Sequence, residues 1–241
     1  MRKTFISSCA VVVAFAAGAT DFTLKPGVSG VFDWTDGANY DNAGQAPTVG
    51  NSDAVCVPNG VEVLITNGMD SASLALINSL SRIRPMGASS KVKFFVEEGQ
   101  TLTISCAVNY NGGAAACLGE VVKEGGGVLQ LTAGADQIKY GIHCTAFFVA
   151  ITVNEGELRM NQEWTGSGDV YYGKVTVAKG ATWRPFAVLS AIVYGGFWGG
   201  GAITNAATGS QMFYVSGGTA AAPCVFSGEL QGRCSIGLNG M

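Results

Sequence analysis

The fold of this 241-residue chain is decided by the unit from Val121 to Met160. It opens Val121-Val-Lys-Glu-Gly-Gly-Gly-Val-Leu-Gln-Leu-Thr-Ala-Gly134 and closes Ile151-Thr-Val-Asn-Glu-Gly-Glu-Leu-Arg-Met160. Apolar and polar residues alternate in both segments, as they do in a strand with one buried face. Glycines separate the alternating segments and are typical of turns. The unit therefore predicts several short, half-buried strands.

The same alternation runs along most of the chain, for example in Val61–Ile65, Leu102–Ile104, Ile151–Val153 and Val175–Val177. One short strand cannot bury its apolar stripe alone, whereas stacked turns of strands bury it as a continuous core. The pattern predicts an all-β protein with a single β-solenoid domain over residues 20–241. At roughly 20 to 25 residues per coil, we expect nine or ten coils. A β-sandwich is the alternative, because alternation alone does not separate the two.

One segment, Ser71 to Ile83, also fits a helix, since Leu74, Ile77, Leu80 and Ile83 recur at intervals of three behind a candidate Ser71 cap. Leu74 and Leu76 alternate as strand residues as well. Both readings stay open for this segment.

The unit 121–160 resembles the autotransporter-associated β-strand repeat. Lys123, Gly125, Gly127, Leu129 and Leu131 match the K-x-G-x-G-x-L-x-L opening of such repeats, and the closing match comprises Val153, Gly156, Leu158 and Met160. The segment 226–232 is similar to the F-S-G-x-L-x-G element that precedes a new repeat. The opening W-x-x-x-x-N and D-x-V-x-x-x-N-G elements of such proteins resemble residues 34–39 and 53–60.

This resemblance implies a right-handed parallel β-helix of the pectin-lyase-like kind and a role as an exported surface protein. Full-length members carry a C-terminal barrel of alternating strands. The sequence lacks such a segment after residue 232. We therefore expect either a short secreted relative or an incomplete chain, and self-secretion is not carried over.

The amino terminus has the pattern of a secretory signal peptide, residues 1–19. Arg2 and Lys3 precede an apolar run from Phe5 to Ala17, which is too short for a membrane helix. Ala17 and Ala19 supply the small residues before a cleavage site, so we expect cleavage between Ala19 and Thr20. Because no later segment reaches the length of a membrane helix, the mature chain is expected to be secreted or held at the cell surface.

Composition excludes several classes of protein. With 48% hydrophobic and 13% charged residues, the chain is too apolar to be disordered. A net charge of −3, without a cluster of Lys and Arg, argues against nucleic acid as a partner.

Six cysteines remain after the expected processing, an even number that permits disulfides in an exported chain. The shortest closures join Cys106 to Cys117 and Cys224 to Cys234, although Cys117 and Cys144 could instead stack on successive coils. No C-x-x-C spacing indicates a metal site.

The sequence predicts no catalytic, cofactor-binding or metal-binding residue. His143 is the single histidine, and Cys144 beside it points to the opposite face of a strand, which is a poor arrangement for proton transfer. Glu155 and Glu157 share a strand face by spacing and could form a carboxylate pair, but a solvated polar face is the simpler explanation. We expect the chain not to be an enzyme.

Aromatic residues could form a platform on which sugar rings stack, and the candidates are Tyr171, Tyr172, Trp183 and Trp198. Two functions therefore stay open. The first is a non-catalytic structural or adhesive surface protein that contacts cell-envelope components, glycans or other surface proteins. The alternative is a carbohydrate-active β-helix, a polysaccharide lyase or hydrolase.

Overall fold

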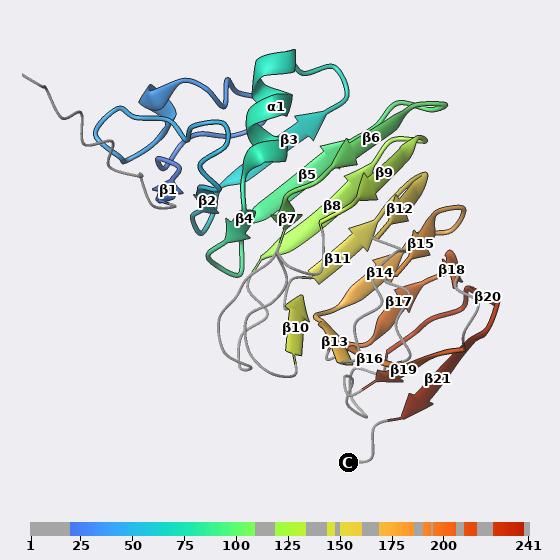
Figure 1. The fold of residues 1–241 in the computed structure, drawn as a ribbon. Helices are drawn as coiled ribbons and strands as arrows, with labels where there is room; N and C mark the ends of the chain where they lie inside the picture. The colour runs from blue at the N-terminus through green and yellow to red at the C-terminus, as the bar shows by residue number, and fades with distance from the viewer. Residues whose placement is uncertain are drawn as a thin grey trace, which may run out of the picture.

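The computed structural model describes residues 20–108, 119–133, 144–147, 150–160, 169–185, 190–193, 195–205, 210–215 and 224–238. The predicted signal peptide, with Ala19, lies outside this part. All paired strands in it run parallel, and strands of successive coils stack along one axis to form four sheets (Figure 1). The predicted all-β solenoid is confirmed, and its form is that of a right-handed β-helix. Parallel pairing excludes the β-sandwich, whose sheets are antiparallel.

Four sheets, here numbered I to IV, contain the strands. Sheet I is made of β1 (Asp21–Thr23), β2 (Ala54–Val57), β4 (Arg82–Pro85) and β7 (Ala107–Val108). Sheet II is made of β3 (Glu62–Thr66), β5 (Lys91–Phe95), β8 (Glu120–Glu124), β11 (Ala150–Val153), β14 (Val175–Val177) and β17 (Phe197–Gly199). Sheet III is made of β6 (Thr101–Ile104), β9 (Val128–Leu131), β12 (Glu157–Arg159), β15 (Thr182–Arg184), β18 (Ala202–Thr204) and β20 (Glu229–Gln231). Sheet IV is made of β10 (Cys144–Phe147), β13 (Asp169–Tyr172), β16 (Ser190–Val193), β19 (Gln211–Val215) and β21 (Cys234–Leu238).

The core consists of columns of inward-facing side chains that occupy the same position on successive strands. In sheet II one column is Val63, Val92, Val121, Ile151, Val175 and Phe197. In sheet III the matching column is Leu102, Leu129, Leu158, Trp183, Ile203 and Leu230. The apolar stripes read from the sequence are therefore the inner faces of the stack.

Coil length varies along the axis. Lys91 pairs with Glu120 on the next coil, a step of 29 residues, whereas Val175 pairs with Phe197 after 22 residues. Sheets II and III each contain six strands among the residues that the structure describes. The expected nine or ten coils were too many, because several coils are longer than 25 residues.

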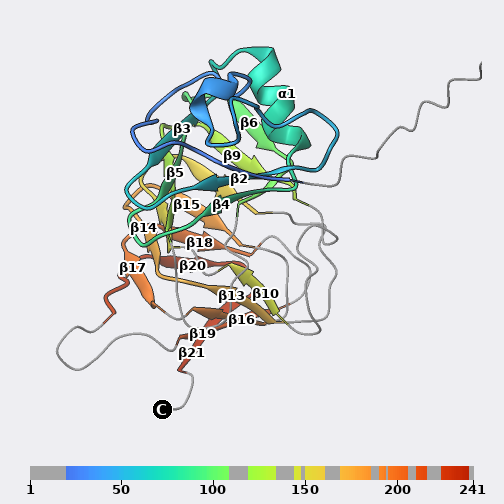
Figure 2. The same ribbon diagram turned by 90° about the vertical axis from the view of Figure 1, so that its left-hand side faces the viewer.

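Helix α1 (Ser71–Ser79) closes the first coil and lies at the N-terminal end of the stack, opposite the C-terminal end (Figure 2). It connects β3 to β4 and so takes the place that β6 has in the following coil. The cap is Asp70 rather than Ser71, and its carboxylate accepts a hydrogen bond from the Ser73 amide at 2.8 Å. The helix is therefore confirmed for residues 71–79, and the strand interpretation of Leu74 and Leu76 is wrong; Ile83, the last residue of the segment, belongs to β4.

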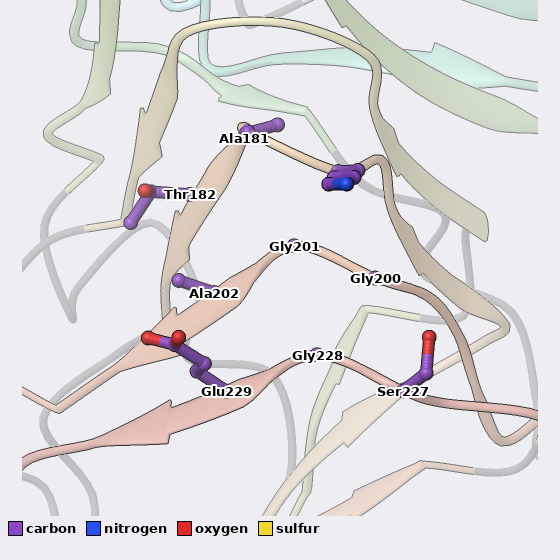
Figure 3. Close-up of a pocket in the computed structure, with 10 residues that line it drawn as sticks. Ala181, Thr182, Gly200, Gly201, Ala202, Ser227, Gly228 and Glu229 are labelled. Carbon is purple, nitrogen blue, oxygen red and sulfur yellow. The ribbon is translucent and has the colours of Figure 1, made fainter.

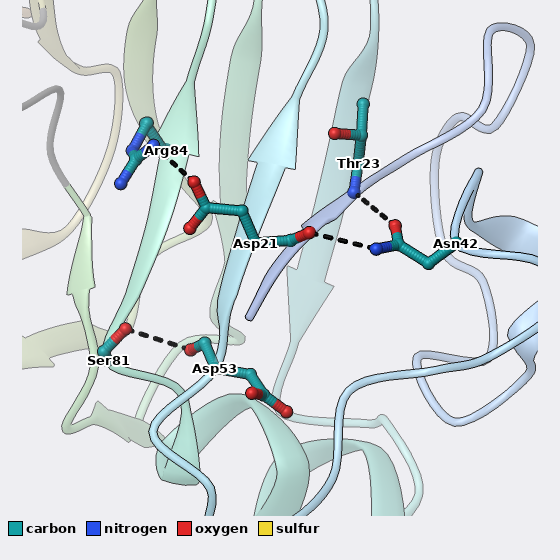
Figure 4. A network of polar contacts seen from close by, with 6 residues as sticks. All are labelled: Asp21, Thr23, Asn42, Asp53, Ser81 and Arg84. Carbon is teal, nitrogen blue, oxygen red and sulfur yellow. Dashed lines mark hydrogen bonds and ion pairs between the residues drawn. The ribbon is translucent and has the colours of Figure 1, made fainter. Parts of the chain in front are cut away.

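The loop that follows β1 closes the N-terminal edges of two sheets. The Asn42 amide acts as a strand would, accepting from the Thr23 amide and donating to the Asp21 carbonyl, both at 3.1 Å (Figure 4). Gly30 of the same loop pairs with β3. Its amide donates to the Glu62 carbonyl at 2.9 Å, and its carbonyl accepts from the Leu64 amide at 2.8 Å. The backbone groups of these edge strands are thus paired, which protects them from adding a foreign strand.

Polar contacts also connect the first strands of sheet I to one another. Asp21 forms an ion pair with Arg84 of β4 at 2.9 Å, and the Asp53 carbonyl accepts from the Ser81 hydroxyl at 3.1 Å (Figure 4). The buried Asp53 carboxylate also accepts from the amides of Thr20 and Thr48, each at 3.0 Å. These contacts join residues far apart in sequence, which fixes the loop on the stack.

A lysine lies inside the core of sheet II. In the second inward column Lys123 sits between Phe94 and Val153, and it is fully buried. Its ammonium group reaches the corner before β9 and β12, where it donates to the carbonyls of Glu124 at 2.9 Å, Gly125 at 2.6 Å and Glu155 at 3.2 Å. Burial of this charge is tolerated because three acceptors replace water.

Candidate functional site

The outer face of sheet III carries a ladder of polar side chains along the stack. Because successive strands are in register, each outward position forms a row parallel to the axis. One row contains Thr103, Gln130, Arg159, Arg184, Thr204 and Gln231, and the row beside it contains Thr101, Val128, Glu157, Thr182, Ala202 and Glu229. This face offers hydrogen-bond donors and acceptors at the roughly 4.8 Å spacing of neighbouring strands.

Two arginines and one glutamate form the centre of this ladder. Glu157 accepts from the Arg159 guanidinium at 2.8 Å and forms an ion pair with Arg184 on the next strand. Burial alone would raise the pKa of Glu157, but the hydrogen bond from Arg159 and the charge of Arg184 outweigh it and lower that pKa. The carboxylate therefore stays ionised, and the cluster carries a net positive charge.

A groove of about 310 Å³ opens beside this cluster, at the corner where the coils enter sheet III. In Figure 3 Ala202 lies between Thr182 and Glu229, which belong to the strands on either side of it. Lys179 and Ser227 complete the polar lining. The small side chain of Ala202 interrupts the row of larger polar residues, so the groove is a notch in the same face and not a separate cavity.

Sheet II presents a different outer face, on which the charges pair with one another across strands. Lys93 lies 2.9 Å from Glu62 and 3.8 Å from Glu124, and Lys91 lies 3.3 Å from Glu120. Surface pairs of this kind add little stability individually.

The predicted aromatic platform is wrong for Trp183. This side chain is fully buried in the core column and packs against Phe197 and Phe213, with ring centroids 6.1 and 6.0 Å away. Its neighbours Thr182 and Arg184 point outward instead, as alternation in a strand requires. Trp183 therefore cannot stack on an external sugar.

Trp198 does lie on the outer face of sheet II, at a partly exposed position. The Lys174 ammonium lies over its ring, 4.7 Å from the centroid, and its indole nitrogen donates to the Gly195 carbonyl at 3.0 Å. One face of the ring is thus engaged by a cation. Tyr171 and Tyr172 lie in β13, and their side chains fall outside the described part.

Of the two proposed disulfides, only the pair Cys224 and Cys234 lies wholly within the described residues. Cys106 is buried, and burial raises the pKa of its thiol to about 12, while its proposed partner Cys117 lies outside the described residues. Cys224 and Cys234 are not bonded to each other, and the Cys234 thiol donates to the Gln231 carbonyl at 3.4 Å.

The structure separates the carboxylate pair that spacing had placed on one strand face. Glu155 lies in the turn before β12, with its carbonyl on Lys123, and only Glu157 belongs to the strand. His143 lies outside the described residues. Within the residues that are described, no group of three or more His, Cys, Asp or Glu side chains could hold a metal ion. Likewise, no helix found there is long and apolar enough to span a bilayer.

The arginine cluster and the buried lysine were not predicted from the sequence, although the alternation of inward and outward residues along each strand indicates both positions. Arg159 and Arg184 follow inward Leu158 and Trp183, which places them outward in register. Lys123 is two residues from inward Val121, which places it in the core.

No protein-family model matches the chain, and comparisons with curated proteins and with solved structures likewise yield no match.

Proposed function

We propose that this chain is an exported, non-catalytic surface protein of the autotransporter-associated β-strand repeat type, and that it binds glycans of a cell envelope through the outer face of sheet III. The signal-peptide pattern of residues 1–19 supports export, and the repeat pattern of residues 121–160 supports the family. Adhesion follows from the long, regular faces of a solenoid, which offer extended binding surfaces.

The observation that carries the binding proposal is the arginine–glutamate cluster within a ladder of Thr and Gln side chains. Arg159 and Arg184 are about one-third exposed, at 37% and 33%, so their outer edges can still donate to a ligand. Guanidinium groups bind carboxylates with two parallel hydrogen bonds. A polysaccharide that carries carboxylates is therefore the preferred ligand, and the Thr and Gln side chains pair with its hydroxyls.

The alternative, a polysaccharide lyase or hydrolase, has weaker support. A glycosidase needs two carboxyl groups about 5 to 10 Å apart, one of which must hold a proton. Among the residues that the structure describes, Glu229 is the one carboxylate that lines the groove, and the two arginines keep Glu157 ionised. An ionised Glu157 has no proton to give and cannot act as the general acid.

The proposal is tested by incubating the purified protein with immobilised alginate, a polyuronate, and with dextran, a neutral glucan, while the products are analysed by chromatography. We expect retention on alginate, weaker retention on dextran, and both polymers recovered at their original length. Shortened chains or unsaturated ends from either polymer would establish the enzymatic alternative. Absence of retention on both polymers would defeat the glycan proposal.

A further inference from the structure

The groove beside the arginine–glutamate cluster brings together a cation, an anion and two hydroxyl groups. Lys179 and Ser227 lie at the corner before sheet III, and Thr182 and Glu229 lie on its strands (Figure 3). Among the residues that the structure describes, none binds the Lys179 ammonium. The exposed Glu229 carboxylate accepts from the side-chain amide of Gln231 at 3.0 Å, through one of its two oxygens. Hydrogen-bond donors and an acceptor are therefore available to a ligand.

Small residues make the room in this groove. Gly180 and Gly200 stand two positions before Thr182 and Ala202 on successive coils, and a Cβ on Gly180 would meet nothing within 4 Å. Ala202 has the smallest side chain of its outward row. The volume of about 310 Å³ lies at the lower end of the range of small-molecule sites. The groove therefore suits a single sugar residue rather than a longer segment.

The opposite charges of the groove restrict the substituent that such a sugar can carry. A sulfate would be attracted by Lys179 but repelled by Glu229, and an ammonium group would experience the reverse. An acetamido group is neutral, so its carbonyl can accept from Lys179 or Ser227 while its N–H donates to Glu229. Its methyl group can contact the Ala202 side chain. Of these three substituents, only the acetamido group uses both charges without repulsion.

The groove lies close enough to the arginine cluster for one polysaccharide chain to reach both. Ala202 is on the strand next to that of Arg184 and is two positions nearer the corner. A rise of about 3.3 Å per residue and a strand spacing of about 4.8 Å place the two Cα atoms roughly 8 Å apart. Adjacent residues of a polysaccharide can span such a distance. A uronate held by Arg184 thus brings its neighbour to the groove.

We propose that the outer face of sheet III selects a polysaccharide in which uronates alternate with N-acetylated amino sugars. The uronate binds Arg184, and the acetamido group of the next sugar enters the groove. This inference rests on the proposed function, because it takes the binding of carboxylates by the arginines as its starting point. A chain made of uronates alone would instead bring a second carboxylate next to Glu229, which is unfavourable.

Titration calorimetry with hyaluronan and alginate oligosaccharides, matched in their number of carboxylates, tests this selection. Hyaluronan alternates glucuronate with N-acetylglucosamine, and we expect it to bind at least about tenfold more tightly. Ala202→Gln fills the groove and should remove this preference, while the affinity for alginate changes less than about twofold. Thr101→Gln is the matched control at an exposed position of the same outward row, and it should leave both affinities unchanged.

Hyaluronan from which the acetyl groups have been removed separates the acetamido group from the rest of the chain. Its ammonium groups would face Lys179, so its affinity should fall to that of alginate or below. Undiminished binding of the deacetylated polymer, equal binding of hyaluronan and alginate, or equal weakening of both by Ala202→Gln would overturn this inference alone. Absence of binding to every polymer would overturn the proposed function with it.

Discussion

The Lys123 ammonium donates a hydrogen bond to the Glu155 carbonyl at 3.2 Å, across two successive coils of the stack. The same group holds the carbonyls of Glu124 and Gly125 on its own coil. One buried lysine thus ties the corner between sheets II and III of one coil to the same corner of the next. The glycine-rich turn after β8 is held by this contact as well as by its own backbone.

Replacing this lysine with methionine should destabilise the fold. Met fills a similar volume but leaves the carbonyls without their shared donor, at a cost of about 1–3 kcal/mol in the free energy of unfolding. Urea unfolding followed by circular dichroism measures the loss. Lys91→Met removes a lysine from a neighbouring exposed ion pair and should cost less than about 1 kcal/mol. Equal losses for the two variants would refute the corner role.

Stability should also depend on pH through this group. Burial lowers the pKa of Lys123 from 10.5 to about 8, although the Glu155 carboxylate opposes the shift. Between these values the unfolded chain keeps the proton that the folded chain has lost. The unfolded state therefore binds more protons, and stability rises with pH in this window. Relative to Lys123→Met, the wild type should gain stability from pH 8 to 10.5; a constant difference would contradict the lowered pKa.

The same Leu→Ala substitution should lower the free energy of unfolding by different amounts at two positions of one core column. Leu158 is fully buried in the middle of its column, so Leu158→Ala leaves a cavity and should cost about 2–5 kcal/mol. Leu230 continues the same column in β20 but is 37% exposed, so Leu230→Ala should cost less than about 1.5 kcal/mol. Chemical denaturation of both variants checks this order, which a sandwich or a molten core would not produce.

Substitutions at two glycines with a left-handed backbone allow the cost of backbone strain to be separated from the cost of a steric clash. Gly156 has a φ of +63°, and a Cβ there would collide with the Gly127 carbonyl of the preceding coil. Gly180 has a φ of +87°, with nothing within 4 Å of the added carbon. Gly180→Ala should therefore cost about 1–2 kcal/mol from backbone strain alone. Thermal unfolding should show a clearly larger loss for Gly156→Ala, and a similar loss for both would disprove the tight contact between coils.

Much of the fold was predictable, because the inward columns are written as alternation in the sequence. Leu129, Leu158 and Trp183 occupy one column, as a two-residue period requires. From its sequence alone Trp183 is nevertheless a candidate for a sugar platform, since an aromatic residue suits either face of a strand. Trp183 is known to face the core because Thr182 and Arg184 on either side of it point outward. The pairing of β15 with the neighbouring coils shows this.

The candidate site was harder to predict, because it is assembled from neighbouring coils. Arg159 and Arg184 lie 25 positions apart in sequence and meet only through the parallel pairing of β12 with β15. Coil length differs from place to place, so spacing alone does not show which outward residues become neighbours. The pairing of Asn42 with β1 is hidden for the same reason, since its side-chain amide binds the strand edge from 19 and 21 positions away in the sequence.

Binding of alginate by paired variants of the two outer faces tests the functional account most directly. Arg159→Gln with Arg184→Gln removes the cations of sheet III, and Lys91→Gln with Lys93→Gln removes an equal charge from sheet II. The account predicts that titration calorimetry finds at least about tenfold weaker binding for the first pair and nearly unchanged binding for the second, with both proteins folded. Equal weakening by both pairs, or loss confined to the sheet II pair, would contradict it.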